Sequence, residues 1–448
     1  MKTKSKVDNY TLLTQGPVGK VIVRMAIPTI ISMLVTSLYN LVDSYYVGQI
    51  NTQATAAVGV AFPIMSVMQA IGFFFGQGTG TYISRLLGAK RKDEASSIAS
   101  TGFLFSIVFG VLLAIFGLLF LEPLAKICGS TDTILPYTKS YLGIILLGTP
   151  IVCATMVLNN QMRFQGNAAT AMYGLLAGAV LNVALVPLFT FTFDMGITGT
   201  GIGTVLSQIA GFAVLAYLSR RGENIHLSIK DVSFNKTFFI ELVKGGTPSM
   251  SRQGLASLAT MLLNLQAAVY GDAAIAAMSI VGRVSFVVFA VVIGIGQGFQ
   301  PFCGFNYGAK LYGRVRQGYG YAVKFSLIFL AFCCVLCWAF APTVVDVMRH
   351  DADVVRIGTE ALRWQVISWP LVPFIIIGNM ALQTSGWAIS ANIVAATRNG
   401  ICFIPLIFLL PLCFGLFGIE VCQAAADTLS FFIAVPLTIN FFRTLKKK

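Results

Sequence analysis

Charged side chains are scarce in this sequence. Asp, Glu, Lys and Arg make up 11% of its 448 residues, and hydrophobic residues make up 56%. A soluble domain carries about a quarter charged residues. Several stretches run for about twenty residues or more with almost no charge, the length that a helix needs to cross a hydrocarbon layer roughly 30 Å thick. These features predict an all-α integral membrane protein, and the absence of strand-like alternation argues against an outer-membrane barrel.

The sequence also lacks the patterns of most catalytic and metal sites. It has two histidines, and its nine cysteines lie mostly in apolar segments. The CxxC within "CCVLC" has no second pair, so we expect these cysteines to pack and not to bind metal. The glycine runs "GQGTG" and "GTGIG" lack a preceding strand and a Walker lysine and serine, which favours close helix packing. We therefore expect no enzyme activity, no cofactor and no ATP site.

The positive charges are unevenly placed. There are 31 Lys and Arg against 17 Asp and Glu, a net charge of +14. The Lys and Arg gather at the N-terminus, in "RLLGAKRKDE", in the segment 219–246, in "GAKLYGRVR" and in the tail "RTLKKK". By the positive-inside rule these five places face the cytoplasm. We therefore expect both termini inside, an even number of spans, and no nucleic-acid partner.

Twelve hydrophobic spans are expected. They lie near residues 22–47, 55–84, 95–121, 134–164, 168–193, 197–219, 247–270, 274–304, 317–341, 355–384, 388–411 and 417–442. The spacing of Phe234, Phe238 and Leu242 predicts a short amphipathic helix on the inner membrane surface. The expected organisation is a cytoplasmic N-terminal segment (1–20), an N-lobe of six spans (21–219), a cytoplasmic linker (220–246), a C-lobe of six spans (247–442) and a basic tail (443–448).

The two halves are copies of each other. A shift of 220 residues places "GQGTGTYISRLLGAK" on "GQGFQPFCGFNYGAK", Pro28 on Pro248 and Asn159 on Asn379. Near the end the register changes, and we expect "GTGIGTV" to match "GLFGIEV". Because each repeat has six spans, both copies enter the membrane in the same orientation. This predicts two lobes related by an axis along the membrane normal, with a cavity between them.

Asp43 is an acidic residue near the outer end of the first span. Because an unpaired charge is costly in a bilayer, Asp43 must face protein or water, as a proton or cation site or as a structural hydrogen-bond acceptor. Neutral polar residues of the same half are candidates to complete such a site or to line a substrate cavity, and each is equally suited to bridge helices. They are Asn40, Tyr141, Asn159, Asn160, Asn182, Thr204 and Gln208.

The second half has no acidic residue at the position equivalent to Asp43, where Leu263 stands. Its polar candidates for a substrate cavity are Gln253 and Asn264 in the seventh span and Asp427 in the last span. For Asp427, helix packing is an equal alternative. Arg398 lies within the eleventh span, and we expect it to be the structural partner of a carbonyl or carboxylate group.

Several stretches resemble the multidrug and toxic compound extrusion (MATE) family of bacterial efflux transporters. They are "LYNLVDSYYVGQ", "GQGTGTYISRLLGAKRKDEA", "RFQGNAATAM", "GIGQGFQPFCGFNYGAK" and "RNGICFIPLIFLLP". "QPFCGFNYGAK" is typical of one bacterial branch of the family. The resemblance extends from about residue 15 to 443. It implies two six-helix lobes that export bulky organic cations in exchange for H⁺ or Na⁺.

The resemblance also implies a cation site in the N-lobe. The site consists of Asp43 with the matching residues Tyr141, Asn159, Asn182 and Thr204. The family pattern places an aspartate four residues after Asn182, but Val186 stands there in this sequence. The acidic pair that another branch of the family has in its C-lobe is absent. A single carboxylate carries one proton, whereas Na⁺ prefers more oxygen ligands, so this departure favours H⁺ coupling.

The expected function is therefore secondary active efflux of organic, cationic or amphipathic, compounds by alternating access. The alternative is a flippase for lipids or polysaccharide precursors, which would be expected to have a strongly cationic cavity. We expect a monomer in the bacterial cytoplasmic membrane, with small organic substrates and membrane lipid as its partners.

Overall fold

The structure, a computed structural model, describes residues 8–221 and 225–447, apart from the side chains of residues 40 and 41. All regular structure in these two ranges is helical, which confirms the predicted all-α class. The first half contains α1 (Asn9–Gln15), α2 (Val18–Gly48), α3 (Thr52–Gly88), α4 (Lys92–Leu119), α5 (Leu121–Ile127), α6 (Leu135–Phe164), α7 (Ala168–Pro187), the π-helix η1 (Leu188–Thr192) and α8 (Gly196–Ser219).

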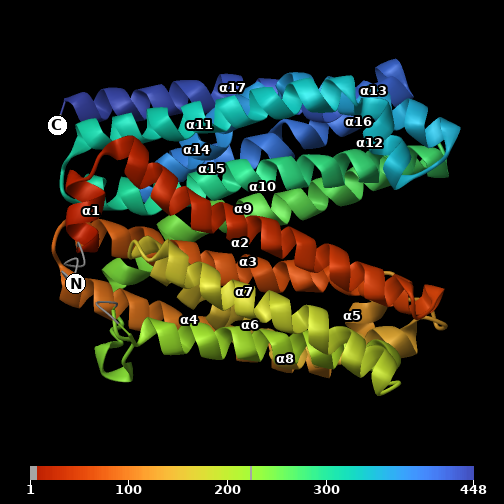
Figure 1. Cartoon of the computed structure of the whole chain (residues 1–448), viewed down its shortest axis with the longest axis horizontal. Helices are drawn as coiled ribbons and strands as arrows, with labels where there is room; N and C mark the ends of the chain where they lie inside the picture. Colours follow the sequence, from red (N-terminus) through yellow and green to blue (C-terminus); the bar gives the residue numbers. More distant parts are fainter. Residues whose placement is uncertain (1–7, 222–224, 448) are drawn as a thin grey trace, which may run out of the picture. The chain divides into compact units, whose positions relative to one another are not determined.

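The second half contains a second set of long helices (Figure 1), some of which are divided by 3₁₀ or π-helical turns. It contains the 3₁₀ helix η2 (Ile229–Asp231), α9 (Lys236–Ala268), α10 (Asp272–Gly308), α11 (Tyr312–Ala339), α12 (Ala341–Met348), α13 (Ala352–Ser368), the 3₁₀ helix η3 (Trp369–Leu371), α14 (Val372–Thr384), α15 (Ala388–Ala396), the π-helix η4 (Thr397–Ile401), α16 (Phe403–Phe414) and α17 (Leu416–Lys446).

Eleven of the helical segments in the described residues are long and apolar enough to cross a membrane. The twelfth expected span is α9, which has the length of a span, 33 residues. Its sequence is more polar because Arg252, Gln253 and Asn264 lie within it. The end of α9 at Ala268 lies 220 residues after the end of α2 at Gly48, so α9 is the repeat equivalent of the first span.

The linker between the halves differs from the sequence prediction. The predicted amphipathic surface helix is not a separate element, because α9 begins at Lys236 and continues into the seventh span. Phe238 and Leu242 are buried in clusters with residues of α3, α4 and α6, whereas Phe234 is exposed before the helix begins. The apolar face of this stretch therefore packs against protein.

The chain divides into two compact units that do not follow the simple order of the sequence. One unit contains Ile31–Met250 and the segment that ends at Gln15, and the other contains Gly16–Ile30 and the segment that starts at Ser251. Helices α2 and α9 therefore each begin in one unit and end in the other. Pro28 and Pro248, which are equivalent in the repeat, lie inside these helices next to the change of unit. A proline inside a helix removes a backbone hydrogen bond and favours a bend.

The repeat is visible in individual contacts. The Nδ2 atom of Asn159 donates to the Ala171 carbonyl at 2.8 Å, and Asn379 donates to the Ala391 carbonyl at 2.6 Å. Lys90 and Lys310 both have positive φ angles, 61° and 59°. Each of these pairs is separated by 220 residues, as the sequence predicts.

The predicted register of the last span is wrong. Gly196 and Gly415 both have positive φ angles, 53° and 60°, and each lies at the start of the last span of its repeat, so the shift there is 219. This pairs Gly199 with Gly418, not with Gly415. The connection before the last span differs in length between the repeats, because residues 193–195 separate η1 from α8 whereas Gly415 alone separates α16 from α17.

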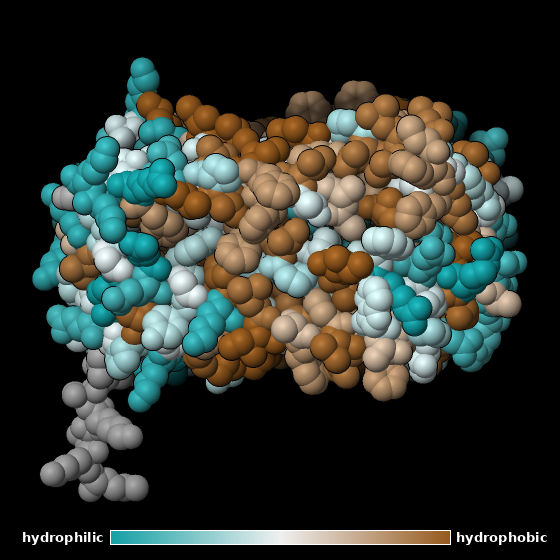
Figure 2. Space-filling view, turned by 90° about the horizontal axis from the view of Figure 1, so that it is seen from above, coloured by the Kyte–Doolittle hydropathy of each residue, from teal (hydrophilic) through white to brown (hydrophobic). Residues whose placement is uncertain are grey.

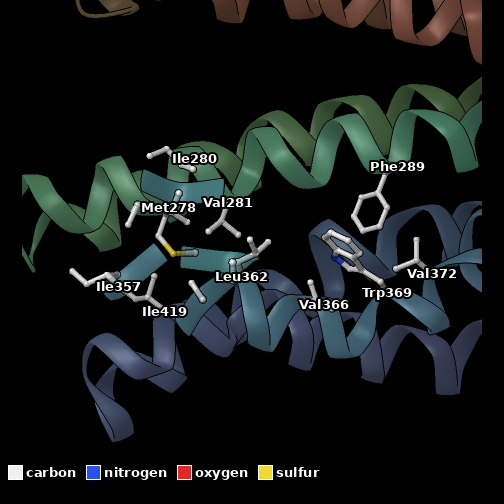
Figure 3. Packing of buried hydrophobic residues seen from close by; sticks show 14 of the residues in the cluster. Met278, Ile280, Val281, Phe289, Ile357, Leu362, Val366, Trp369, Val372 and Ile419 are labelled. Atoms are coloured by element: carbon white, nitrogen blue, oxygen red, sulfur yellow. The ribbon is translucent and has the colours of Figure 1, made fainter. Parts of the chain in front are cut away.

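Apolar side chains lie both inside the units and on their surface. In the second unit a core cluster surrounds the fully buried Trp369, which contacts Phe289 edge to face (Figure 3). On the outside, Figure 2 shows apolar residues over the middle of the visible face and polar residues toward its ends. Exposed apolar side chains along the spans are expected where lipid is the solvent.

We predict that Gly199→Ala and Gly418→Ala each lower the free energy of unfolding by about 1–3 kcal/mol, because overpacking has that cost. A Cβ at Gly199 would overlap the Phe189 carbonyl group, and one at Gly418 would overlap the Leu410 carbonyl group. These are backbone atoms, which cannot rotate away as a side chain can. Thermal unfolding of the purified protein, followed by tryptophan fluorescence, measures the effect.

Gly59→Ala and Gly282→Ala are the matched controls. A Cβ at either position meets nothing within 4 Å, and both residues lie in helices. Alanine is favoured over glycine in a helix by about 1 kcal/mol, so the controls are expected to keep or raise the melting temperature. Equal melting temperatures for all four variants would contradict the prediction.

Candidate cation site

A polar cluster lies within the first unit, near the Gly48 end of α2. It comprises Asp43 on α2, Tyr141 on α6, Asn182 on α7, and Thr204 on α8. Tyr141 and Asn182 are fully buried, Thr204 is 1% exposed and Asp43 is 9% exposed. Four helices therefore contribute to one cluster around a single carboxylate.

The contacts of the Asp43 carboxylate are few. Thr204 forms a side-chain hydrogen bond with it. Asn182 Nδ2 lies 3.5 Å from Thr204 Oγ1, so Thr204 links the carboxylate to α7. Tyr141 lies close enough to Asp43 to interact with its charge. No Lys or Arg forms an ion pair with Asp43 among the described residues.

Glu122, outside the spans, provides a contrast. Its carboxylate accepts hydrogen bonds from Lys126 and Lys139 at 3.0 and 3.1 Å. These hydrogen bonds lower the pKa of Glu122, Lys126 contributing first. Asp43 has no such basic partner among the described residues. A negative charge on Asp43 is therefore stabilised only by hydrogen bonds and dipoles of neutral groups.

Three buried oxygen atoms of the cluster have no hydrogen-bond partner among the described residues. They are Asp43 Oδ1, Tyr141 Oη and Asn182 Oδ1. Buried polar atoms in proteins are nearly always hydrogen-bonded, so a group of unpartnered ones calls for an explanation. Carboxylate, hydroxyl and amide oxygens are groups that accept a proton or coordinate a hard cation. The residues therefore fit a proton or a small cation.

Tyr39 also belongs to the cluster and is absent from the sequence-based set. It forms side-chain hydrogen bonds with Thr204 and Gln208, and it interacts with the charge of Asp43. The spacing in "LYNLVD" could have indicated this residue, because Tyr39 and Asp43 are four positions apart and residues with that spacing lie on one face of a helix. Gln208 thereby joins the periphery of the site.

Val186 marks the place of the missing acid. It is fully buried one helical turn after Asn182. A Cβ on Gly203 of α8 would lie 2.9 Å from the backbone of Val186, so α7 and α8 approach closely there. The side chain at this position is therefore held beside α8, next to the helix face that carries Thr204.

Asn159 and Asn160 lie away from this cluster. They are 18 or more residues beyond Tyr141 on the same helix, α6, which corresponds to about 27 Å along its axis. Asn159 binds the Ala171 carbonyl. Asn160 Oδ1 accepts from Gln77 at 3.1 Å and from Arg163 at 2.6 Å, so both asparagines connect α6 to its neighbours near the Phe164 end of the helix. The side chain of Asn40 lies outside the described residues.

In the second unit no acidic side chain occupies the position equivalent to Asp43. Leu263, at the position of Asp43, packs against apolar core clusters. Gln253 and Asn264 are half-buried on α9. No group of three or more His, Cys, Asp or Glu side chains suited to a metal occurs among the described residues.

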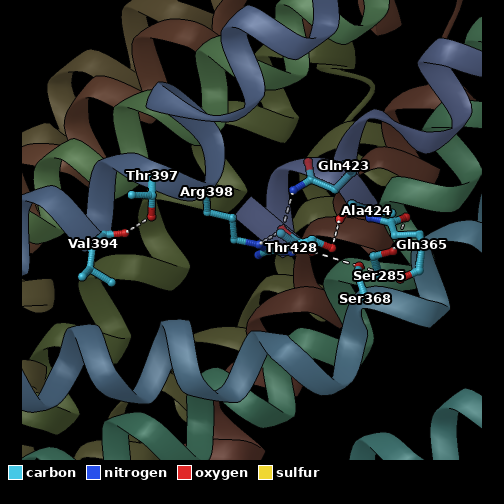
Figure 4. A network of polar contacts seen from close by, with 10 residues as sticks. Ser285, Gln365, Ser368, Val394, Thr397, Arg398, Gln423, Ala424 and Thr428 are labelled. Carbon is cyan, nitrogen blue, oxygen red and sulfur yellow. Dashed lines mark hydrogen bonds and ion pairs between the residues drawn. The ribbon is translucent and has the colours of Figure 1, made fainter. Parts of the chain in front are cut away.

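Asp427 instead accepts several buried hydrogen bonds, and its donors Arg398, Gln423 and Ser368 are labelled in Figure 4. Its oxygens accept from Arg398 Nε at 2.7 Å and Nη2 at 3.3 Å, from Gln423 at 2.9 Å, and from Ser368 at 3.3 Å. The sequence-based expectation that Arg398 has a carboxylate or carbonyl partner is confirmed. In the register given by Gly196 and Gly415, Asp427 is equivalent to Gln208 of the first unit.

Two six-span repeats, helices that change unit beside a proline, and a buried carboxylate among polar groups define the class of two-lobe membrane transport proteins. A MatE family model matches residues 28–188 and 248–409, one match in each repeat and together more than half of the chain. The chain belongs to the MatE, or multidrug and toxic compound extrusion, family of transporters. The predicted family and twelve-span fold are thus confirmed.

Relatives of similar length are known in staphylococci. The multidrug export protein MepA of Staphylococcus haemolyticus is 29% identical over 435 residues, covering 96% of this chain and 95% of that protein. MepA of Staphylococcus aureus is 27% identical over 447 residues, covering 97% and 98%.

Solved structures share the fold. An outward-facing multidrug resistance MATE transporter superposes with a TM-score of 0.94 at 24% identity, covering 99% of this chain and 100% of that one. A MOP superfamily transporter from Pyrococcus furiosus, described as having a binding pocket of reverse polarity, superposes with a TM-score of 0.93 at 24% identity and the same coverage.

Proposed function

We propose that the protein exports amphipathic organic compounds across the bacterial cytoplasmic membrane, as an antiporter driven by an ion gradient. The observation that carries this proposal is the Asp43 cluster, in which a buried carboxylate has no basic partner among the described residues. Such a group changes charge when it takes up a proton or a cation. Transport then follows if that change of charge favours one of the two states of an alternating-access cycle.

The division into two units supports alternating access. Helices α2 and α9 connect the units, and each contains a proline next to the point where it passes from one unit to the other. A bend at Pro28 and at Pro248 allows each unit to move as a body while both helices stay continuous. We propose that both termini are cytoplasmic and that a monomer suffices, because the Asp43 cluster is complete within one unit.

H⁺ is the proposed coupling ion. The cluster offers one carboxylate, because Val186 occupies the position of the family's second acid. A proton needs only that carboxylate, whereas Na⁺ needs several oxygen ligands held together at once. The neutral groups Tyr39, Tyr141, Asn182 and Thr204 are suited to stabilise the charged and the neutral form of Asp43 by hydrogen bonds.

Flippase activity is the alternative. It would call for a strongly basic interior, but the charge of Arg398 is offset by Asp427 in the same network. Because the Arg398–Asp427 pair carries no net charge, it offers no excess positive charge for a phosphate group with more than one negative charge. Efflux of small compounds fits the observed charges better.

The test is efflux of ethidium from liposomes that contain the purified protein. We expect efflux under an imposed pH gradient and no acceleration by a Na⁺ gradient alone. Efflux driven only by Na⁺ would overturn the choice of ion. Efflux driven by neither gradient, together with scrambling of a labelled lipid, would favour the flippase.

A further inference from the structure

The buried network around Asp427 contains one side chain, that of Arg398, which is only partly buried. Arg398 uses Nε and Nη2 to bind Asp427, and no hydrogen bond among the described residues involves its Nη1 atom. Asp427 is fully buried, whereas the Arg398 side chain is 18% exposed. The network therefore holds the guanidinium group in place and leaves one edge of it accessible.

The accessible edge does not face lipid. Arg398 lies ten residues into the span Ala388–Phe414, close to its middle. Ile389, Ile393 and Ile401 are exposed and mark the lipid side of this span. Arg398 lies against Phe289 of α10 and Asp427 of α17, within the second unit. A charged group at this depth is stable only toward protein or water, so the open edge of Arg398 faces water inside the protein.

The guanidinium group is fixed from two further directions. Its carbon atom lies 4.6 Å above the centre of the Phe289 ring. The backbone of Arg398 belongs to the π-helix η4. The Cys402 N–H closes this turn by donating to the Thr397 carbonyl at 2.9 Å. π-helical turns are found frequently at functional sites. In the other repeat the π-helix lies elsewhere, at η1, so this turn is not imposed by the repeat.

We propose that Arg398 binds the carboxylate group of a transported compound. This inference rests on the proposed efflux function and deepens it, because the substrates would then include zwitterionic compounds with an apolar body. A planar guanidinium group with fixed orientation is well suited to a carboxylate, which accepts hydrogen bonds in the same plane. Asp427 and Gln423 act as positioning residues, since they hold Arg398 and do not contact the ligand.

Rhodamine 110 and its methyl ester, rhodamine 123, test the proposal. The two dyes share the same xanthene body, and only rhodamine 110 carries a free carboxylate. We expect Arg398→Lys to weaken rhodamine 110 binding by about tenfold or more, the contribution of one hydrogen bond to a charged group, and to leave rhodamine 123 binding unchanged. Binding is measured by fluorescence polarisation with the protein in discs of phosphatidylcholine.

Asp427→Asn is the second variant and is expected to act in the opposite direction. It removes the charge that offsets Arg398, so rhodamine 110 should bind more tightly while rhodamine 123 again changes little. Arg363→Lys is the matched control, because Arg363 stacks over Trp338 in the same unit and is not part of the network. A purely structural ion pair would shift the binding of both dyes together in both variants, which would overturn the proposal.

Two further outcomes would also overturn the proposal. If phosphatidylglycerol in the discs removes the rhodamine 110 preference, the ligand of Arg398 is a lipid headgroup and not a small substrate. If ethidium efflux is normal but the dye preference does not depend on Arg398, the inference fails while the proposed function stands. If the wild type shows no gradient-driven efflux of ethidium, the proposed function itself fails.

Discussion

Asp43→Asn is expected to reduce gradient-driven ethidium efflux to the rate of liposomes without protein. Asn has nearly the shape of Asp and keeps the hydrogen bond with Thr204, but it cannot take up and release a proton. The variant should still bind ethidium and should unfold at the same or a higher temperature, because it removes a buried charge that has no basic partner among the described residues.

The matched control for this variant is Asp194→Asn. Asp194 is an exposed residue of the same unit with a φ angle of 53°, a conformation that Asn also tolerates. The control should transport as the wild type does. Efflux at the wild-type rate in Asp43→Asn would show that another group carries the coupling proton, and the proposed mechanism would have to be abandoned.

Arg398→Met is expected to destabilise the protein by about 3–5 kcal/mol, because it leaves a buried carboxylate without its ion-pair partner. Asp427 is fully buried, so water cannot replace the guanidinium group. The remaining bonds from Gln423 and Ser368 do not neutralise the charge. Unfolding by sodium dodecyl sulfate from mixed micelles measures the free energy.

The double variant Arg398→Met/Asp427→Leu is expected to recover most of this loss, because an apolar pair of similar volume often replaces a buried ion pair without cost. The double-mutant cycle isolates the interaction between the two residues. If the double variant is as unstable as the sum of the single variants, the two residues contribute independently and the network does not act as a unit. A stable double variant that still prefers rhodamine 110 would count against the role of Arg398 in binding.

The sequence alone determined the architecture. Low charge and long apolar stretches are sufficient for membrane spans, because the bilayer accepts only helices whose length and polarity fit it. The constant shift of 220 residues showed the repeat in the sequence. The same shift relates equivalent hydrogen bonds in the structure, such as Asn159 with Ala171 and Asn379 with Ala391. Asp43 was also identifiable as a candidate, since a carboxylate in an apolar span must face protein or water.

Only the tertiary structure decided which residues meet. Tyr141 and Asn159 occur on one helix and were grouped by resemblance, yet the rise of the helix places them far apart. Tyr39 joins Asp43 because both lie on one face of α2, and Asp427 is paired because α17 brings it to Arg398. The passage of α2 and of α9 from one unit to the other likewise cannot be predicted from composition or periodicity. These features depend on packing between helices, and local sequence patterns do not contain that information.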